Sequence, residues 1–159
     1  MEIKVAIKKL ITIYKQEIEY YQELLTLTHQ QKQLIADEKF NELEEAIVAK
    51  GELIEKIDRL ENKLQPLKDK LIDQFDLPSE TWLLELRDKS TSQELNSLIN
   101  RLKEVVNKLS KREKANKKLI KDKKDQLTNE INQVKEGNKV NKSYTKKKRI
   151  HSTFIDQKS

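Results

Sequence analysis

The feature that most constrains this chain is an apolar stripe at helical spacing that runs through most of its length. In the first segment the stripe residues are three, four or seven positions apart, which places them on one face of a helix. They are Ile3, Ile7, Leu10, Tyr14, Ile18, Tyr21, Leu25, Thr28 and Ile35. Only two Gly and two Pro interrupt the 159 residues. A helix over residues 2–36 would be about 50 Å long, and it would need a partner along most of that length.

A second long helix is predicted after a short break. Asp37, Glu38 and Lys39 interrupt the apolar rhythm, and the stripe resumes over residues 39–74. Two long helices joined by so short a loop are expected to lie antiparallel as neighbours. Pro66 lies inside this second stripe, where a proline either kinks a helix or stands in the first turn of a new one. The sequence leaves both alternatives open.

A short helix and a third long helix complete the predicted fold. Leu77-Pro78 marks a break, after which Ser79 is expected to cap a helix over residues 79–88 that carries a tryptophan. Residues 90–92 form a second break and cap, and a stripe over residues 92–136 predicts the last helix. The sequence therefore predicts an all-α protein, an elongated antiparallel helical bundle or coiled coil of three long helices and one short helix.

The charge of the chain is concentrated at its C-terminal end. The formal net charge is +6, and residues 135–159 account for all of it, with eight Lys or Arg against Glu136 and Asp156. We therefore expect residues 1–137 to form the helical bundle and residues 138–159 to form a disordered, flexible basic tail.

The residue types in the chain argue against several kinds of site. No cysteine occurs, which excludes disulfides, thiolate metal sites and cysteine nucleophiles. His29 and His151 are the only histidines, and neither stands in a metal-binding or catalytic-triad pattern. There is no glycine-rich loop of the kind that holds phosphates. We expect no enzyme activity, no metal and no cofactor.

Hydropathy and charge also bear on location and on binding to membranes and nucleic acids. No run of about 18 apolar residues occurs, and the first ten residues lack the continuous apolar core of a signal peptide, so we expect a cytoplasmic protein without membrane insertion. The basic run Lys146–Arg149 would attract polyanions. Its neighbouring aromatic residues are not spaced as a stacking platform for bases, so we expect no specific nucleic-acid binding.

The order of the elements and one short motif carry a family signal. Two long helices precede a short helix after Leu77-Pro78, and a long helix with Asn116-Lys117-Lys118-Leu119-Ile120 follows. The segment Ser152–Lys158 fits the pattern S-x-F-I-D-x-K. These features, which span almost the whole chain, resemble the FlgN family of flagellar type III export chaperones. The lysine-rich residues 108–124 depart from the family, whose third helices tend to be rich in glutamine and leucine.

The resemblance implies a cytoplasmic chaperone that binds the helical ends of flagellar hook-associated proteins. Such a chaperone prevents premature association of these clients and delivers them to the export apparatus, and the family pattern places client binding toward the C-terminal helix. Here the stripe of that helix is interrupted over residues 112–123, which favours a groove for a client helix. The candidate client-binding residues are Leu119, Ile120, Leu127, Ile131 and Val134. The candidate contacts of the tail are Tyr144, Phe154 and Ile155.

Other interpretations of the same stripe stay open at this point. The five candidate residues of the last helix would equally serve to cover the first two helices. They would also support self-association, either as a homodimer or as a coiled-coil scaffold without an export role. A nucleic-acid accessory protein would instead bind through residues 139–149, and its affinity would fall steeply with salt.

Overall fold

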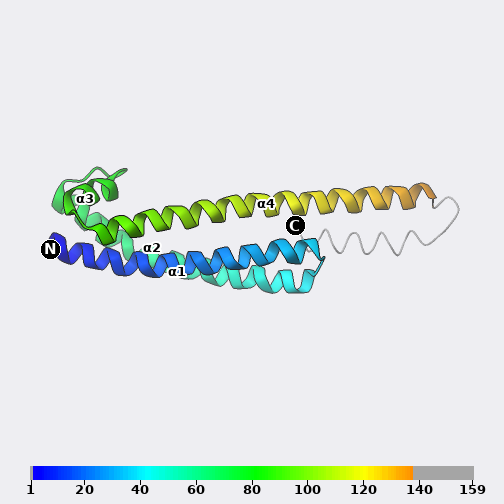
Figure 1. Cartoon of the computed structure of the whole chain (residues 1–159), viewed down its shortest axis with the longest axis horizontal. Coiled ribbons are helices and arrows are strands. Elements are labelled where there is room, and N and C mark those ends of the chain that lie inside the picture. The colour runs from blue at the N-terminus through cyan, green and yellow to red at the C-terminus, as the bar shows by residue number, and fades with distance from the viewer. Residues whose placement is uncertain (1, 138–159) are drawn as a thin grey trace. The chain divides into compact units, whose positions relative to one another are not determined.

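The computed structural model describes residues 2–137, and these residues form four helices (Figure 1). Helix α1 spans Ile3–Ala36, α2 spans Phe40–Phe75, α3 spans Trp82–Ser90 and α4 spans Gln93–Gly137. No strand occurs among the described residues, and the predicted all-α fold of three long helices and one short helix is confirmed. The chain divides into two compact units, Met1–Glu113 and Lys114–Ser159, so α4 contributes to both.

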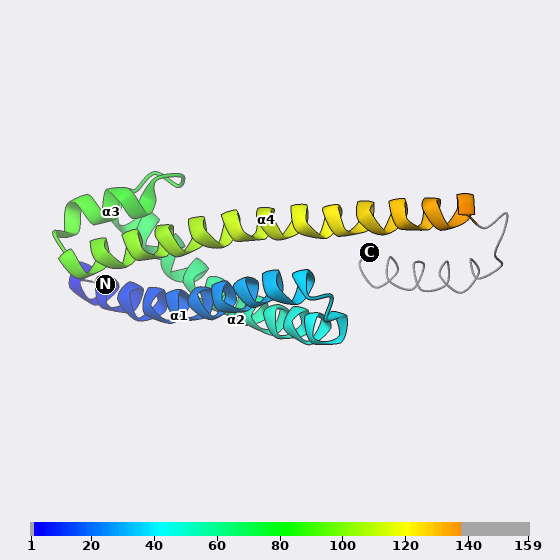
Figure 2. The same ribbon diagram turned by 45° about the vertical axis from the view of Figure 1, so that its right-hand side comes forward.

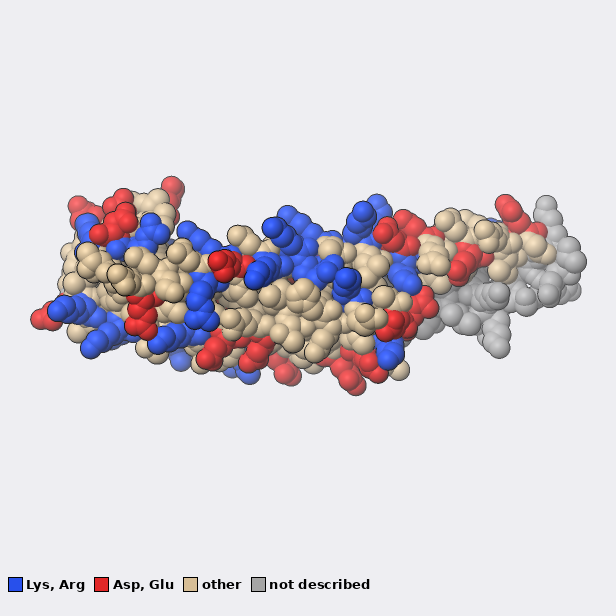
Figure 3. Space-filling view, in the orientation of Figure 1, with Lys and Arg blue, Asp and Glu red and all other residues tan. Residues whose placement is uncertain are grey.

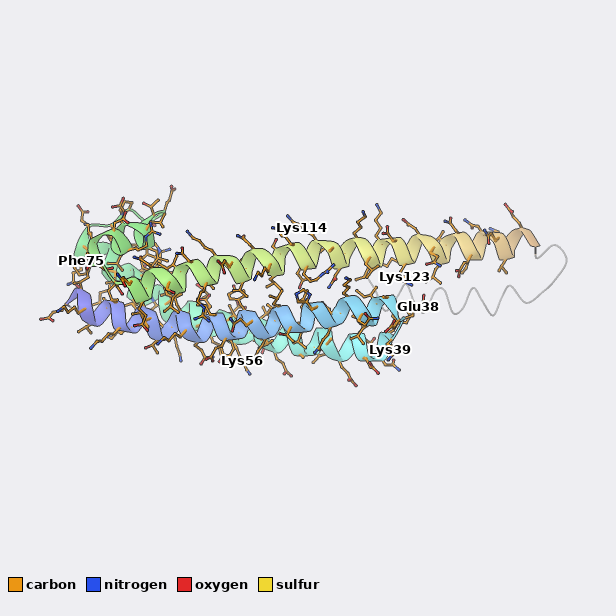
Figure 4. All side chains as sticks on the ribbon, in the orientation of Figure 1. Glu38, Lys39, Lys56, Phe75, Lys114 and Lys123 are labelled. Atoms are coloured by element: carbon orange, nitrogen blue, oxygen red, sulfur yellow. The ribbon has the colours of Figure 1, made fainter. Side chains whose placement is uncertain are left out.

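Helices α1 and α2 form an antiparallel hairpin. They lie side by side in both ribbon views (Figures 1 and 2), and Glu38 and Lys39 mark the turn between them (Figure 4). The backbone N–H of Asp37 donates to the carbonyl of Gln33 at 2.9 Å, and that of Lys39 donates to the carbonyl of Leu34 at 2.9 Å. These bonds satisfy carbonyls that a helix end otherwise leaves without an intrahelical donor. A turn of three residues is therefore enough to reverse the chain.

Helix α2 continues through Pro66 without a break. Proline has no N–H, so residue 66 donates no hydrogen bond to the carbonyl of Asn62, one turn earlier. Pro66 is exposed, whereas Leu64 and Leu71 are buried on the opposite side of the helix. The proline thus occupies the solvent side of a single helix, and the alternative of two separate helices is not adopted.

Two apolar clusters hold the first unit together. The larger cluster joins the beginning of α1 to the end of α2, to α3 and to the beginning of α4; its fully buried leucines are Leu10, Leu71, Leu86 and Leu95. The second cluster lies further along the hairpin and consists of Leu24, Leu53, Ile57 and Leu109, with Tyr20, Tyr21, Leu25 and Leu27 packed against it. Each fully buried leucine contributes about 1.5–3 kcal/mol, so these clusters provide much of the packing energy.

Helix α3 carries the chain from α2 to α4. The residues that follow α2 and α3, Asp76 and Thr91, both have left-handed backbone conformations, with φ of 50° and 55°. The prediction that Ser79 caps this helix is wrong, because residues 79–81 form a turn and the helix begins at Trp82. Trp82, the first residue of the helix, is buried in the larger cluster.

The beginning of α4 agrees with the predicted break and cap. The backbone N–H of Leu95 donates to the hydroxyl of Ser92 at 3.2 Å, which makes Ser92 the N-cap of the helix. Glu94, in the first turn, forms an ion pair with Lys15 of α1 at 2.9 Å. A carboxylate near the positive end of the helix dipole is favourable in itself, although both partners of this pair are largely exposed and it adds little to stability.

Candidate functional site

The apolar stripe of α4 has two parts with different surroundings. As far as Leu109, most of its residues belong to the two apolar clusters; they are Leu95, Leu98, Ile99, Leu102 and Leu109. Among the described residues, none after Leu109 belongs to either cluster. The five candidate client-binding residues are all partly exposed and lie in the second unit; they are Leu119, Ile120, Leu127, Ile131 and Val134.

Helix geometry brings four of these five residues to one face. Ile120, Leu127, Ile131 and Val134 follow one another at steps of seven, four and three. At about 100° per residue they lie within about 60° of one another and extend along about 21 Å of the helix. Leu119 lies about 100° from Ile120 around the helix, at the edge of this face. We call the four residues on the face the α4 stripe.

Lysines interrupt and flank the α4 stripe. Lys123 and Lys124 are partly buried and occupy the turn between Ile120 and Leu127. Figure 3 shows Lys and Arg side chains gathered along α4, and residues 114–137 contain seven Lys against four acidic residues. Lysine stems cover apolar surface while their ammonium groups stay in water. The face therefore combines apolar anchors with positive charge, which suits an amphipathic helix with acidic flanks.

A buried polar layer marks the place where the apolar packing of α4 ends. The ammonium group of Lys50, on α2, donates to the amide oxygen of Gln31 at 2.8 Å and to a carboxylate oxygen of Glu113. Glu113, on α4, also accepts a hydrogen bond from the hydroxyl of Thr28 at 3.3 Å. Lys50, Gln31 and Thr28 are all buried. These hydrogen bonds link α1, α2 and α4 within the first unit, and a buried polar contact of this kind fixes the register of the helices.

The polar layer was not predicted from the sequence, although a signal for it is present. Lys50 lies on the stripe of α2, four positions after Ala46 and three before Leu53, both of which are buried. A charged residue on an apolar stripe needs a buried partner. Glu113 belongs to the interruption of the apolar stripe over residues 112–123, and in the structure it supplies that partner. The spacing of residues in the sequence does not give the register between α2 and α4, so the pairing of Lys50 with Glu113 could not be predicted from it.

A buried carboxyl group lies between α1 and α2. Glu17 is 3% exposed, and its side chain is hydrogen-bonded to that of Glu61. Burial, followed by this hydrogen bond and the negative charge of Glu61, raises the pKa of Glu17 to about 8. Burial also raises the pKa of Tyr14 and Tyr21, with a further contribution from the charge of Glu17. Glu17 is thus held largely as a neutral acid at pH 7.

Three further features are the tail contacts, metal sites and membrane-crossing helices. The candidate tail contacts Tyr144, Phe154 and Ile155 lie outside the described residues. Within residues 2–137, no three His, Cys, Asp or Glu side chains come together as a metal site. No helix in that range has the length and hydropathy to cross a bilayer. The described residues define a helical protein whose last helix presents a partly exposed, basic amphipathic face.

Comparison with known families agrees with this architecture. The sequence profile of the family described as FlgN protein matches residues 1–152. The chain therefore belongs to the FlgN family, a family of cytoplasmic chaperones that bind flagellar proteins and act in type III export during flagellum biogenesis. It is not known as a family of enzymes. No curated protein and no solved structure matches the chain.

Proposed function

We propose that this chain is a cytoplasmic export chaperone that binds the helical ends of flagellar hook-associated proteins. It prevents their premature association and delivers them to the flagellar type III export apparatus. The observation that carries the proposal is the α4 stripe, a partly exposed apolar face on a chain that belongs to the FlgN family. Its spacing is the one by which amphipathic helices pack against each other.

The size and chemistry of the α4 stripe suit one client helix. Its length of about 21 Å corresponds to about four helical turns. A client helix of that length would bury the exposed parts of the four residues, and each Å² of apolar surface removed from water contributes about 25 cal/mol. Exposed lysines around the stripe add little to affinity because water and salt screen them. Binding is therefore expected to rest on apolar contact and to persist at high salt.

The first test is a calorimetric titration of the full chain with the C-terminal helical segment of each hook-associated protein from the same organism, at two salt concentrations. Saturable binding at both salt concentrations is the expected result. Absence of binding with every segment, in a chain shown by circular dichroism to be helical, would contradict the proposal. Sedimentation of the same samples would then show whether the stripe serves self-association in a scaffold instead.

Charge substitutions on the α4 stripe give the residue-level test. Replacing Leu127 and Ile131 together by Lys places two charges in the apolar contact, and client affinity should fall at least about tenfold while helicity is retained. The matched control is Thr128→Lys with Asn132→Lys, which adds the same charge at exposed positions one residue further along. This control should bind as the unchanged chain does. A global loss of helix in the first variant would assign Leu127 and Ile131 to internal packing.

We propose a separate role for the basic tail in contacts with client or export apparatus. Tyr144, Phe154 and Ile155 are large apolar residues in a segment that is mainly polar and basic, and such residues commonly serve as anchors when a segment folds on a partner. Replacing Phe154 and Ile155 by Ser should weaken one of these two contacts, measured by titration with client segments and by pull-down of export-apparatus components. Unchanged binding in both measurements would remove this role.

A further inference from the structure

Exposed apolar side chains gather on one short stretch of α2. Ile47, Val48 and Ile54 are 51%, 63% and 47% exposed. The other large apolar residues with comparable exposure in the described chain are single residues on the other helices, Val5, Leu84 and Val106. Isolated exposed apolar residues are normal on protein surfaces, whereas a contiguous group calls for an explanation.

Gly51 lies at the centre of this group. The positions that adjoin a residue on a helix surface are three and four residues away on either side. For Gly51 these neighbours are Ile47, Val48, Ile54 and Glu55. We call Ile47, Val48, Gly51 and Ile54 the Gly51 patch. In this patch the exposed apolar residues Ile47, Val48 and Ile54 surround Gly51.

Packing among the described residues gives no reason for a glycine at this position. A Cβ atom added to Gly51 would meet nothing within 4 Å. Glycine inside a helix costs about 1 kcal/mol relative to alanine, and an alanine would fit here without any adjustment. A glycine among larger side chains lets another backbone or side chain approach the helix closely. Any group that uses this approach would come from outside the described residues.

The surroundings of the Gly51 patch are acidic. Within residues 41–55, Lys50 is the only basic residue, and it is buried and paired with Glu113. The exposed charged residues in the same range are Glu42, Glu44, Glu45, Glu52 and Glu55, of which Glu55 forms an ion pair with Arg59 at 3.8 Å. A partner with positive charge beside its apolar face would therefore complement this rim. A second copy of α2 would bring the same carboxylates and would be repelled.

We propose that the Gly51 patch is a docking surface for a basic amphipathic helix of a second protein. The apolar face of that helix would pack against Ile47, Val48 and Ile54, with its closest approach at Gly51. Lysines or arginines beside its apolar face would pair with the acidic rim. The Gly51 patch belongs to the first unit and the α4 stripe to the second. The inference thus goes beyond client binding, because it gives the chain a separate surface for a second partner.

The test uses two designed peptides with the full chain. Both are labelled 20-residue amphipathic helices with leucine on one face; the basic probe has lysine beside that face, and the acidic probe has glutamate at the same positions. Fluorescence anisotropy should show saturable binding of the basic probe and at least tenfold weaker binding of the acidic probe. Equal binding of the two probes would overturn the proposal.

Substitutions at the Gly51 patch then assign the binding to this surface. Gly51→Gln and Val48→Gln should each lower the affinity for the basic probe at least fivefold. Gly51→Gln should also raise the melting temperature, because the substitution removes a helix-interior glycine and meets open space. Leu84→Gln is the matched control, since it removes an exposed apolar residue from α3, and it should bind as the unchanged chain does. Full binding by both Gly51→Gln and Val48→Gln would overturn the proposal.

Charge substitutions test the acidic rim. Glu52→Gln with Glu55→Gln should weaken binding of the basic probe and flatten its dependence on salt. Glu19→Gln with Glu23→Gln removes two exposed carboxylates from α1 and should change neither property.

Two further measurements test the other possible occupants of the Gly51 patch, which are a second copy of the chain and the chain's own C-terminal segment. A concentration-dependent dimer that Gly51→Gln abolishes would assign the Gly51 patch to a second copy and overturn the proposal. Tighter binding of a peptide of residues 138–159 than of the basic probe would assign the Gly51 patch to the chain's own C-terminal segment. That result would also overturn the proposal.

Discussion

The two parts of α4 have apolar residues at the same helical spacing, and they differ in the residues that lie among them. In Gln93–Glu113 the stripe consists mainly of Leu, Ile and Val and is buried in two clusters. In Lys114–Gly137 apolar residues alternate with lysines, and the α4 stripe is partly exposed. The change occurs at Glu113, about one helical turn after the last clustered residue, Leu109. Periodicity thus defines the apolar face in both parts, and partial exposure of that face coincides with the lysines in the second part.

Truncating one leucine in each part should give the largest difference between them. Leu98→Ala removes a buried side chain from the larger cluster and should cost about 2–5 kcal/mol of unfolding free energy. Leu127→Ala acts on a partly exposed residue and should cost less than about 1 kcal/mol. Urea denaturation of both variants gives the comparison. Equal losses would mean that the two parts of α4 are packed alike.

A smaller effect is expected from breaking the polar layer between the two parts. Glu113→Ala leaves the buried ammonium of Lys50 with Gln31 as its remaining partner, and should cost about 1–3 kcal/mol. The cost is below that of a fully buried pair because the Glu113 side chain is 38% exposed. Urea denaturation measures it, and Glu130→Ala, at an exposed position in the second part, should stay within about 0.5 kcal/mol of the unchanged chain.

The double variant Lys50→Met with Glu113→Leu sharpens this test. It replaces both charges by apolar side chains and should recover most of the loss, because no charge is left buried without a partner. If the double variant is as unstable as Glu113→Ala, the polar layer contributes more than charge compensation.

An effect confined to a pH range is expected at Glu17. Its folded-state pKa of about 8 lies above the ordinary value of 4.5, so the folded chain binds more protons than the unfolded chain between these values. Unfolding free energy should therefore fall as pH rises from about 5 to about 8. Glu17→Gln should reduce this slope and stabilise the chain most near pH 8. Denaturation curves at several pH values provide the measurement.

The control for the Glu17 prediction is Glu23→Gln, which neutralises an exposed carboxylate on the same helix. It should leave the pH slope unchanged. A Glu17→Gln variant with the slope of the unchanged chain would show that Glu17 is ionised in the folded state at neutral pH.

Most of the fold was predictable because its elements are long and strongly periodic. The period of 3.6 residues located the helices around Leu10, Leu53 and Leu98, all of which are buried. The start of α3 was misplaced because Ser79 is a good N-cap in isolation, whereas the helix begins three residues later at Trp82, which is buried in the larger cluster. Pro66 left two alternatives open, since only the packing on either side of it shows that α2 continues.

The candidate site was less predictable than the fold. The α4 stripe follows from periodicity alone, but Leu119 falls at its edge, because adjacent residues on a helix point about 100° apart. The partners Lys50 and Glu113 are 63 residues apart, and pairing them requires the register between α2 and α4. Sequence patterns describe one helix at a time and do not contain that register. Client binding by the α4 stripe stays a prediction.

The three-residue turn of the hairpin has a consequence for the order in which the chain folds. Lys50 meets its α1 partner, Gln31, by closing a loop of 19 residues, and it meets Glu113 by closing one of 63 residues. The longer closure costs about 1 kcal/mol more in chain entropy. The N-terminal helices also leave the ribosome before α4 is synthesised. The hairpin is therefore expected to assemble first, and to present its apolar face as the template on which Gln93–Glu113 becomes ordered.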